Sequence, residues 1–205
     1  MTTALIVEAA ESTLECETSV PQVDLGAAER AVRDLLAAMG VDPTAEVYTE
    51  TPGRVARAYA ELLTPRPFEL TTFANDEGYD ELVIARDIPF QSVCEHHLLP
   101  FHGRAHVGYI PGERILGLSK LARITEHFSR RLQLQERMTQ QIADCLEESL
   151  DPRGVGVMLE AEHLCMSVRG VRAHGSNAVT SAVRGLLRDD MRTRQEFFSL
   201  TRASA

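Results

Sequence analysis

The chain has 205 residues, of which 44% are hydrophobic and 25% are charged, and its formal net charge is −9. This composition is ordinary for a globular domain and excludes a disordered or coiled-coil chain, while the acidic balance excludes a broad basic surface for nucleic acid. No apolar run approaches the roughly 18 residues of a membrane span. Because residues 1–17 also lack a basic leader and a long apolar stretch, we expect a cytoplasmic protein.

The N-terminal part divides into an arm and a helical segment. Residues 1–24 are acidic and show little periodicity, which predicts a flexible arm before a single domain over residues 25–205. Apolar residues at helical spacing predict a first helix from Leu25 to about Gly40. A second helix is expected from Thr51, as its N-cap, to the prolines that begin at Pro65. The helical part of the domain therefore spans residues 25–65.

The rest of the chain alternates between strand and helix patterns. Strands are expected over residues 81–93, 106–110, 155–165 and 177–187, and helices over residues 118–128, 138–150 and 192–200. On the strand 155–165, His163 and Cys165 would point to the same face. This order is typical of an α+β domain with helices on one face of an antiparallel sheet.

The turn after the first strand carries the residues with the clearest chemical meaning. Cys94 and His97 have a C-x2-H spacing that lets both bind one metal ion, and Cys165 is the natural third ligand. Thiolate and imidazole ligands favour zinc, and three protein ligands leave a position for a reactive water. In a structural site, His96 or His163 could be the fourth ligand. The alternative is that these cysteines and histidines are ordinary buried residues.

Two helix starts could bind an anion and a planar ring. Ser119 and Lys120 lie where a helix begins, with Arg123 one turn later, although Ser119 could simply be an N-cap. Gln135 and Glu136 could donate to and accept from the edge of a ring. The alternative for this pair is a solvated first turn with a favourable acid.

Five segments together resemble GTP cyclohydrolase I in order and spacing over about residues 25–200. They read TPGRVARAY, SVCEHHLLPFHGRAHVGYIP, GLSKLARI, RLQLQERMTQQI and EAEHLCMSVRGVR. The resemblance implies a tunnelling fold that assembles into a toroidal homodecamer with active sites between subunits. It also implies hydrolysis of GTP at guanine C8, release of formate, and rearrangement to 7,8-dihydroneopterin triphosphate, the first step of folate or pteridine biosynthesis.

The resemblance also implies residue roles. The zinc ligands would be Cys94, His97 and Cys165, the same set that ligand chemistry suggests. His96 and His163 would transfer protons, and Glu136 with Gln135 would recognise guanine. Ser119 would lie near the ribose and triphosphate, and the phosphate-binding residues would be Lys120, Arg123, Arg169, Arg54 and Arg57.

The sequence departs from the family pattern at Arg57, where some relatives carry lysine, and at Ala178, where threonine is frequent. Neither departure removes a proposed catalytic group, so an active enzyme is expected. Two other functions stay open. Cys94 could be a covalent nucleophile on another purine-like ring, although Cys165 would then have no role. The protein could also be a zinc-stabilised regulator that binds GTP without turnover.

Overall fold

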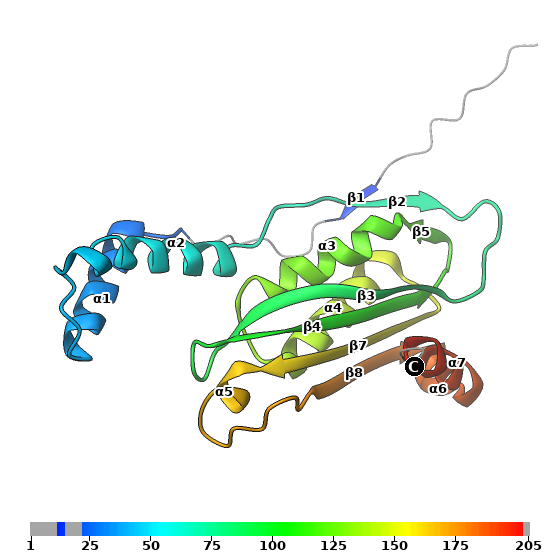
Figure 1. Cartoon of the computed structure of the whole chain (residues 1–205). Coiled ribbons are helices and arrows are strands. Elements are labelled where there is room, and N and C mark those ends of the chain that lie inside the picture. Colours follow the sequence, from blue (N-terminus) through cyan, green and yellow to red (C-terminus); the bar gives the residue numbers. More distant parts are fainter. Residues whose placement is uncertain (1–11, 15–21, 203–205) are drawn as a thin grey trace, which may run out of the picture.

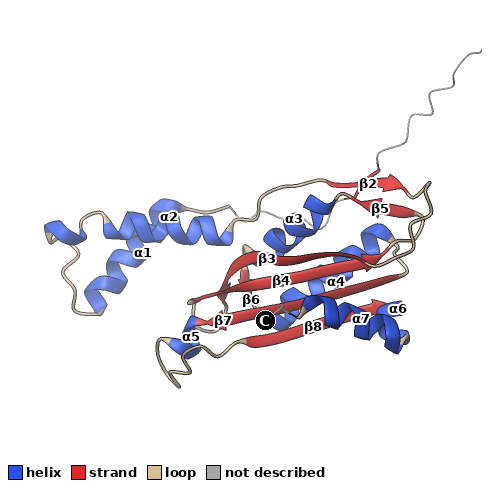
Figure 2. Ribbon diagram, turned by 45° about the vertical axis from the view of Figure 1, so that its right-hand side comes forward, coloured by secondary structure: helices blue, strands red, loops and turns tan. Residues whose placement is uncertain are grey.

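The computed structural model describes residues 12–14 and 22–202, which form two sheets and their covering helices (Figures 1 and 2). The larger sheet has the strand order β6-β3-β4-β7-β8, with antiparallel neighbours except for the parallel pair β3 and β6. Its strands are β3 (Val83–Cys94), β4 (Pro100–Ile110), β6 (Leu132–Gln133), β7 (Gly154–His163) and β8 (Ala178–Gly185). The α+β class predicted from the sequence is confirmed. The short strand β6 falls in the segment expected to be a break between helices.

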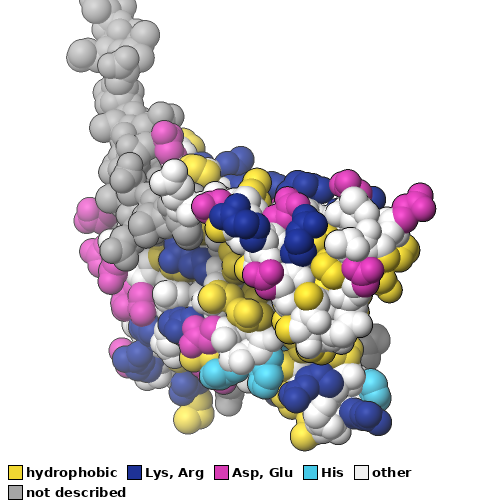
Figure 3. All heavy atoms as spheres, turned by 90° about the vertical axis from the view of Figure 1, so that its left-hand side faces the viewer, with side chains coloured by type: hydrophobic (Ala, Val, Ile, Leu, Met, Phe, Trp, Pro, Cys, Tyr) yellow, Lys and Arg dark blue, Asp and Glu magenta, His cyan; other side chains and the backbone are white. Residues whose placement is uncertain are grey.

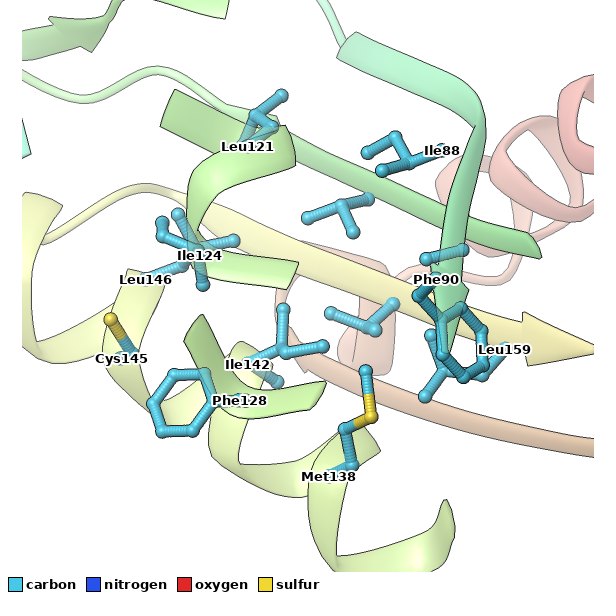
Figure 4. Packing of buried hydrophobic residues seen from close by; sticks show 14 of the residues in the cluster. Ile88, Phe90, Leu121, Ile124, Phe128, Met138, Ile142, Cys145, Leu146 and Leu159 are labelled. Atoms are coloured by element: carbon cyan, nitrogen blue, oxygen red, sulfur yellow. The ribbon is translucent and has the colours of Figure 1, made fainter. Parts of the chain in front are cut away.

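Two helices, α3 (Leu118–Ser129) and α4 (Gln135–Leu150), cover one face of this sheet. Their apolar faces meet over the strands, where Ile124 of α3 and Ile142 and Leu146 of α4 belong to one buried cluster (Figure 4). Both helices were predicted from apolar spacing. The burial of these side chains is the main favourable contribution to folding, and it fixes the N-terminus of α4 against the sheet.

The other face of the sheet is also partly covered, by α6 (Leu186–Asp189) and α7 (Met191–Thr201). Phe197 is fully buried there and packs in a second cluster with Met158. A Cβ on Gly156 would lie 2.6 Å from Leu187 Cδ2 and 2.8 Å from Phe197 Cε2. Glycine in β7 therefore allows these helices to approach the strand closely. The alternating pattern of β7 gives no sign of this second layer.

A small antiparallel sheet, which the sequence did not predict, lies beside the N-terminus of α3. It consists of β1 (Ser12–Leu14), β2 (Leu70–Ala74) and β5 (Arg114–Leu116), in the order β1-β2-β5. Within the arm of residues 1–24, the segment 12–14 thus pairs with β2, and Asp24 caps the next helix through its side chain. The predicted flexibility of the arm otherwise concerns residues 1–11 and 15–21, which lie outside the described residues.

The N-terminal helices project beyond the end of the sheet (Figure 1). They are α1 (Leu25–Ala38), the short 3-10 helix η1 (Glu46–Tyr48) and α2 (Thr51–Leu63). The predicted end of α1 is confirmed by Gly40, whose φ is +79°. The predicted N-cap of α2 was wrong, because Thr51 is the first helical residue and Glu50 precedes it. None of the helices in the described part of the chain is long and apolar enough to cross a membrane.

Candidate active site

Three expected metal ligands come together at one end of the large sheet. The donor atoms of Cys94, His97 and Cys165 all lie within 4.8 Å of one another. Cys94 Sγ and His97 Nδ1 are 3.9 Å apart, a little more than the roughly 3.6 Å between a sulfur at about 2.3 Å and a nitrogen at about 2.05 Å from one tetrahedral zinc ion. Both cysteines are buried and unoxidised, whereas His97 is exposed. The cluster has the composition and spacing of a metal site with one side open.

A tight turn presents the first two of these ligands. Cys94 is the last residue of β3, and its N–H donates to Leu99 O at 2.9 Å while Leu98 N–H donates back to Cys94 O at 2.9 Å. Leu98 has φ of +54°, an uncommon value for a residue with a branched side chain. The turn therefore brings His97 back toward Cys94.

Cys165 lies in a helix and not in the strand that the sequence pattern predicted. The strand expected over residues 155–165 ends at His163, and Cys165 lies in the short helix α5 (Leu164–Ser167). The prediction that His163 and Cys165 share a strand face was therefore wrong. The helical turn redirects Cys165 toward Cys94, and the alternation of a strand no longer applies.

The electrostatics of the cluster favour a bound cation. Burial raises the pKa of the Cys165 thiol, and the neighbouring Cys94 raises it further, while Arg169 acts in the opposite direction. Two adjacent buried thiols therefore cannot both ionise unless a positive charge joins them. A divalent ion would supply that charge, so the donor set fits a metal such as zinc.

Residues that the sequence analysis did not single out hold the turn in place. Glu95 forms a short ion pair with Arg137 of α4, whose guanidinium also donates to Gln133 Oε1 at 3.1 Å. The Arg137 guanidinium lowers the pKa of the Glu95 carboxyl. On the other side, Tyr59 Oη of α2 donates to Leu98 O at 2.7 Å. No motif in the sequence signals the contacts of Glu95 with Arg137 and of Leu98 with Tyr59, because both join segments far apart in the chain.

His163 and Gln135 meet beside the metal ligands. The distance between His163 Nε2 and Gln135 Oε1 is 2.8 Å, and the imidazole stacks on Phe101 with ring centroids 4.5 Å apart and planes within 3°. Burial lowers the pKa of His163, whereas the nearby Glu136 carboxylate raises it. The two helix-start residues are thus distinct, since Gln135 is buried at 2% exposure and Glu136 is exposed.

His96 lies on the exposed side of the same turn. Its ring centroid is 6.3 Å from that of His97, and its side chain is open to solvent. Viewed from this end, the molecule shows histidine side chains with basic side chains on either side (Figure 3). The position of His96 leaves its imidazole accessible to a ligand.

The expected anion-binding residues at the start of α3 lie far from this cluster within one chain. Leu116 N–H donates to Tyr109 Oη at 2.8 Å, and Tyr109 is paired with Val83 at the opposite end of β3 from Cys94. Tyr109 and Pro100 are nine residues apart on β4, which corresponds to about 30 Å at the usual strand rise. Ser119 and Lys120 therefore lie at the far end of the sheet, as Figure 1 shows for the start of α3.

These residues at the start of α3 do not cap the helix, and Lys120 contacts a different segment. The N-cap of α3 is Gly117, so the alternative role of Ser119 as an N-cap was wrong. Lys120 Nζ donates to Glu69 O at 2.7 Å, and Arg123 is exposed on the next turn. Arg169 is exposed and within electrostatic reach of Cys165.

Arg54 and Arg57 occupy a third region, the exposed surface of α2. The same helix contacts the metal-site turn through Tyr59. Within one chain, the structure thus gathers the metal ligands, His163, Gln135 and Glu136, and leaves Ser119, Lys120 and Arg123 at a distance.

Comparisons with known proteins agree with this arrangement. A family model described as GTP cyclohydrolase I matches residues 28–202. The chain is 54% identical to GTP cyclohydrolase 1 from Streptomyces avermitilis over 196 residues, which cover 93% of this chain and 97% of that protein. It is 50% identical to GTP cyclohydrolase 1 from Aquifex aeolicus over 180 residues, covering 88% and 98% respectively. These matches include both segments that carry the metal ligands.

Proposed function

The chain belongs to the GTP cyclohydrolase I family, and we propose that its site hydrolyses GTP at guanine C8, releases formate and yields 7,8-dihydroneopterin triphosphate. The observation that carries this proposal is the cluster of Cys94, His97 and Cys165 in a chain that matches the family over residues 28–202. The product would enter folate or another pteridine pathway.

Zinc is the metal that we propose for this cluster. Two thiolates and an imidazole suit zinc better than magnesium or calcium, and three protein ligands leave one position open. When bound, zinc would supply Lewis-acid activation of water for the attack on C8. The two thiols must stay reduced to bind it, which supports a reducing compartment such as the cytoplasm.

The histidines beside the cluster would transfer the protons that ring opening requires. His163 is half-buried, and its ring plane is fixed by stacking on Phe101. His96 is exposed on the turn and can approach the substrate from another side. An imidazole can both accept and donate a proton at physiological pH, and burial lowers the pKa of His163 from its ordinary value.

Glu136 is the residue that we propose for recognition of guanine. Its carboxylate is exposed at the start of α4 and lies close enough to His163 to influence its pKa. A carboxylate accepts hydrogen bonds from the ring N–H and the exocyclic amine of guanine. Adenine would leave this acceptor without a donor on the ring nitrogen, which disfavours its binding.

The triphosphate would be bound by the basic residues Lys120, Arg123, Arg169, Arg54 and Arg57, with Ser119 near the ribose. The separation of about 30 Å along the strands between the metal cluster and the start of α3 supports a site completed by a second copy of the chain. Lys120 and its neighbours would then come from an adjacent subunit. We propose a homodecamer with active sites between subunits, in keeping with the family resemblance.

The experiment that tests this function is an assay of purified protein with GTP, in which formate and the fluorescence of oxidised neopterin are followed together. We expect both products in equal amounts. Binding of GTP without either product would instead favour a regulatory binding protein. Formation of a covalent adduct on Cys94 without formate would favour the nucleophile alternative, which leaves Cys165 without a role.

A further inference from the structure

The side chain of Gln135 is wholly engaged by the protein. It is 2% exposed, and its Nε2 lies 3.1 Å from Leu159 O, 2.9 Å from Ala178 O and 3.2 Å from Thr180 Oγ1. The first two partners are backbone carbonyls, which only accept hydrogen bonds. The nitrogen of the carboxamide must therefore face them, and the orientation of this amide is fixed by its surroundings.

The two threonine hydroxyls are consistent with the same orientation. Thr139 Oγ1 donates its single hydrogen to the backbone carbonyl oxygen of Gln135 at 2.7 Å. In the 2.7 Å contact between Thr139 Oγ1 and Thr180 Oγ1, Thr180 must then be the donor. Thr180 Oγ1 has used its hydrogen and can accept from Gln135 Nε2. The network therefore has a single consistent set of donors and acceptors.

The donors and acceptors of this network determine which ring nitrogen of His163 carries a hydrogen. Because Nε2 of Gln135 faces the carbonyls, its Oε1 is the atom 2.8 Å from His163 Nε2, and an amide oxygen only accepts. His163 Nε2 must carry a hydrogen. Nδ1 is left with the lone pair of the neutral ring, and none of the described residues hydrogen-bonds to it. Stacking on Phe101 fixes the plane of the ring, and turning the ring over in that plane would put a carbon in place of Nε2 and lose the bond to Gln135.

We propose that Gln135 is a positioning residue that acts through His163 and does not read guanine: it holds the imidazole in the Nε2–H tautomer, so that Nδ1 carries the lone pair of the ring. This inference rests on the proposed function. The hydrogen bond that His163 Nε2–H donates to Gln135 Oε1 thus fixes both the tautomer and the orientation of the imidazole. Ala178 contributes through its backbone carbonyl, so threonine is not needed there for this contact.

Steady-state kinetics distinguish the two roles of Gln135. In Gln135→Met, loss of the bond to His163 should lower kcat about 10- to 100-fold, part of the usual contribution of a positioned proton-transfer group, while KM and Kd for GTP change by less than about threefold. The matched control is Thr180→Val, which keeps both carbonyl acceptors and should alter kcat by less than about threefold. A rise in KM and Kd with kcat unchanged would overturn the proposal in favour of guanine recognition. An equal loss of kcat in Thr180→Val would contradict the assigned role of the carbonyls.

A spectroscopic measurement tests the tautomer without turnover. Solid-state 15N NMR of the zinc-loaded full chain with labelled histidines, at a pH well above the ordinary imidazole pKa of about 6.5, should show His163 with a protonated Nε2 and a bare Nδ1. The His163→Asn spectrum assigns the signals. A wild-type ring protonated at Nδ1 instead would overturn the proposal, even if Gln135→Met failed to fold. Absence of formate from the wild-type enzyme would refute the proposed function and leave this tautomer result standing.

Discussion

Mixing two inactive variants should restore activity if each active site draws on two subunits. Cys165→Ala removes a metal ligand, and Lys120→Met removes a cation at the far end of the sheet. The start of α3 is about 30 Å from the metal cluster along the strands of its own chain. One GTP molecule cannot reach from one to the other, so each variant damages a different half of a shared site.

The expected magnitude follows from random assembly. A site is intact when the subunit that supplies the metal half is not the Cys165→Ala chain and the neighbour that supplies the phosphate half is not the Lys120→Met chain. With equal amounts of both chains, each condition holds for half of the subunits, so about one quarter of the wild-type activity should return. Subunits are mixed by co-expression or by joint refolding, and formate release is measured at saturating GTP.

The control is each variant assembled alone, which should stay below about 1% of wild-type activity because its defect is present in every site. A co-assembled mixture that is no more active than the separate variants would refute the shared site. It would mean that the residues at the start of α3 serve some other function, and that the phosphate groups of GTP are bound by residues of the metal-binding chain itself.

Four further outcomes are expected. Cys165→Ala should lower zinc content, measured by atomic absorption, from about one ion per chain to a small fraction, because two ligands remain; full retention would argue against the site. Arg137→Met should reduce kcat/KM about tenfold, because the turn loses the ion pair that holds Glu95. Stability should change little, since that ion pair is partly exposed. The control is Arg33→Met, which removes an exposed ion pair with Glu29 within α1. Gly156→Ala should lower the free energy of unfolding by about 2 kcal/mol in denaturant titrations, since its Cβ would meet Leu187 and Phe197, and an unchanged midpoint would contradict the close packing. Burial lowers the pKa of His106 below the ordinary histidine pKa of about 6.5, so at pH values below that pKa the unfolded chain binds more protons than the folded chain. The free energy of unfolding should therefore fall as the pH drops below about 6.5. In His106→Gln it should fall less steeply.

Local patterns in the sequence predicted most elements because their causes are local. Apolar spacing gave α3 and α4, and glycine at position 40 ended α1 with a positive φ. The strands β2 and β5 and the second helical layer were missed. They depend on pairing and packing between distant segments, such as the contact of Gly156 with Phe197. A period of two along β7 cannot show which layer covers its second face.

The candidate site likewise has a part that the sequence predicts and a part that depends on packing between distant segments. Ligand chemistry identified Cys94, His97 and Cys165, although the path to Cys165 through α5 was not predicted. The sequence could not show that Gln135 faces inward and Glu136 outward, because adjacent residues at the start of a helix differ only in which side meets the sheet. Burial against β7 and β8 decides it, and that burial involves residues 24 to 45 positions away.

Hydrolysis of GTP by this protein should require a metal held by the Cys94–His97–Cys165 cluster. The most direct test is to follow formate release by the same preparation as purified, after removal of metal with a chelator, and after zinc is restored in stoichiometric amount. If the cluster holds this metal, turnover should disappear with chelation and return with zinc at about one ion per chain. Formate release that continues at the original rate in protein shown to be free of metal would contradict it.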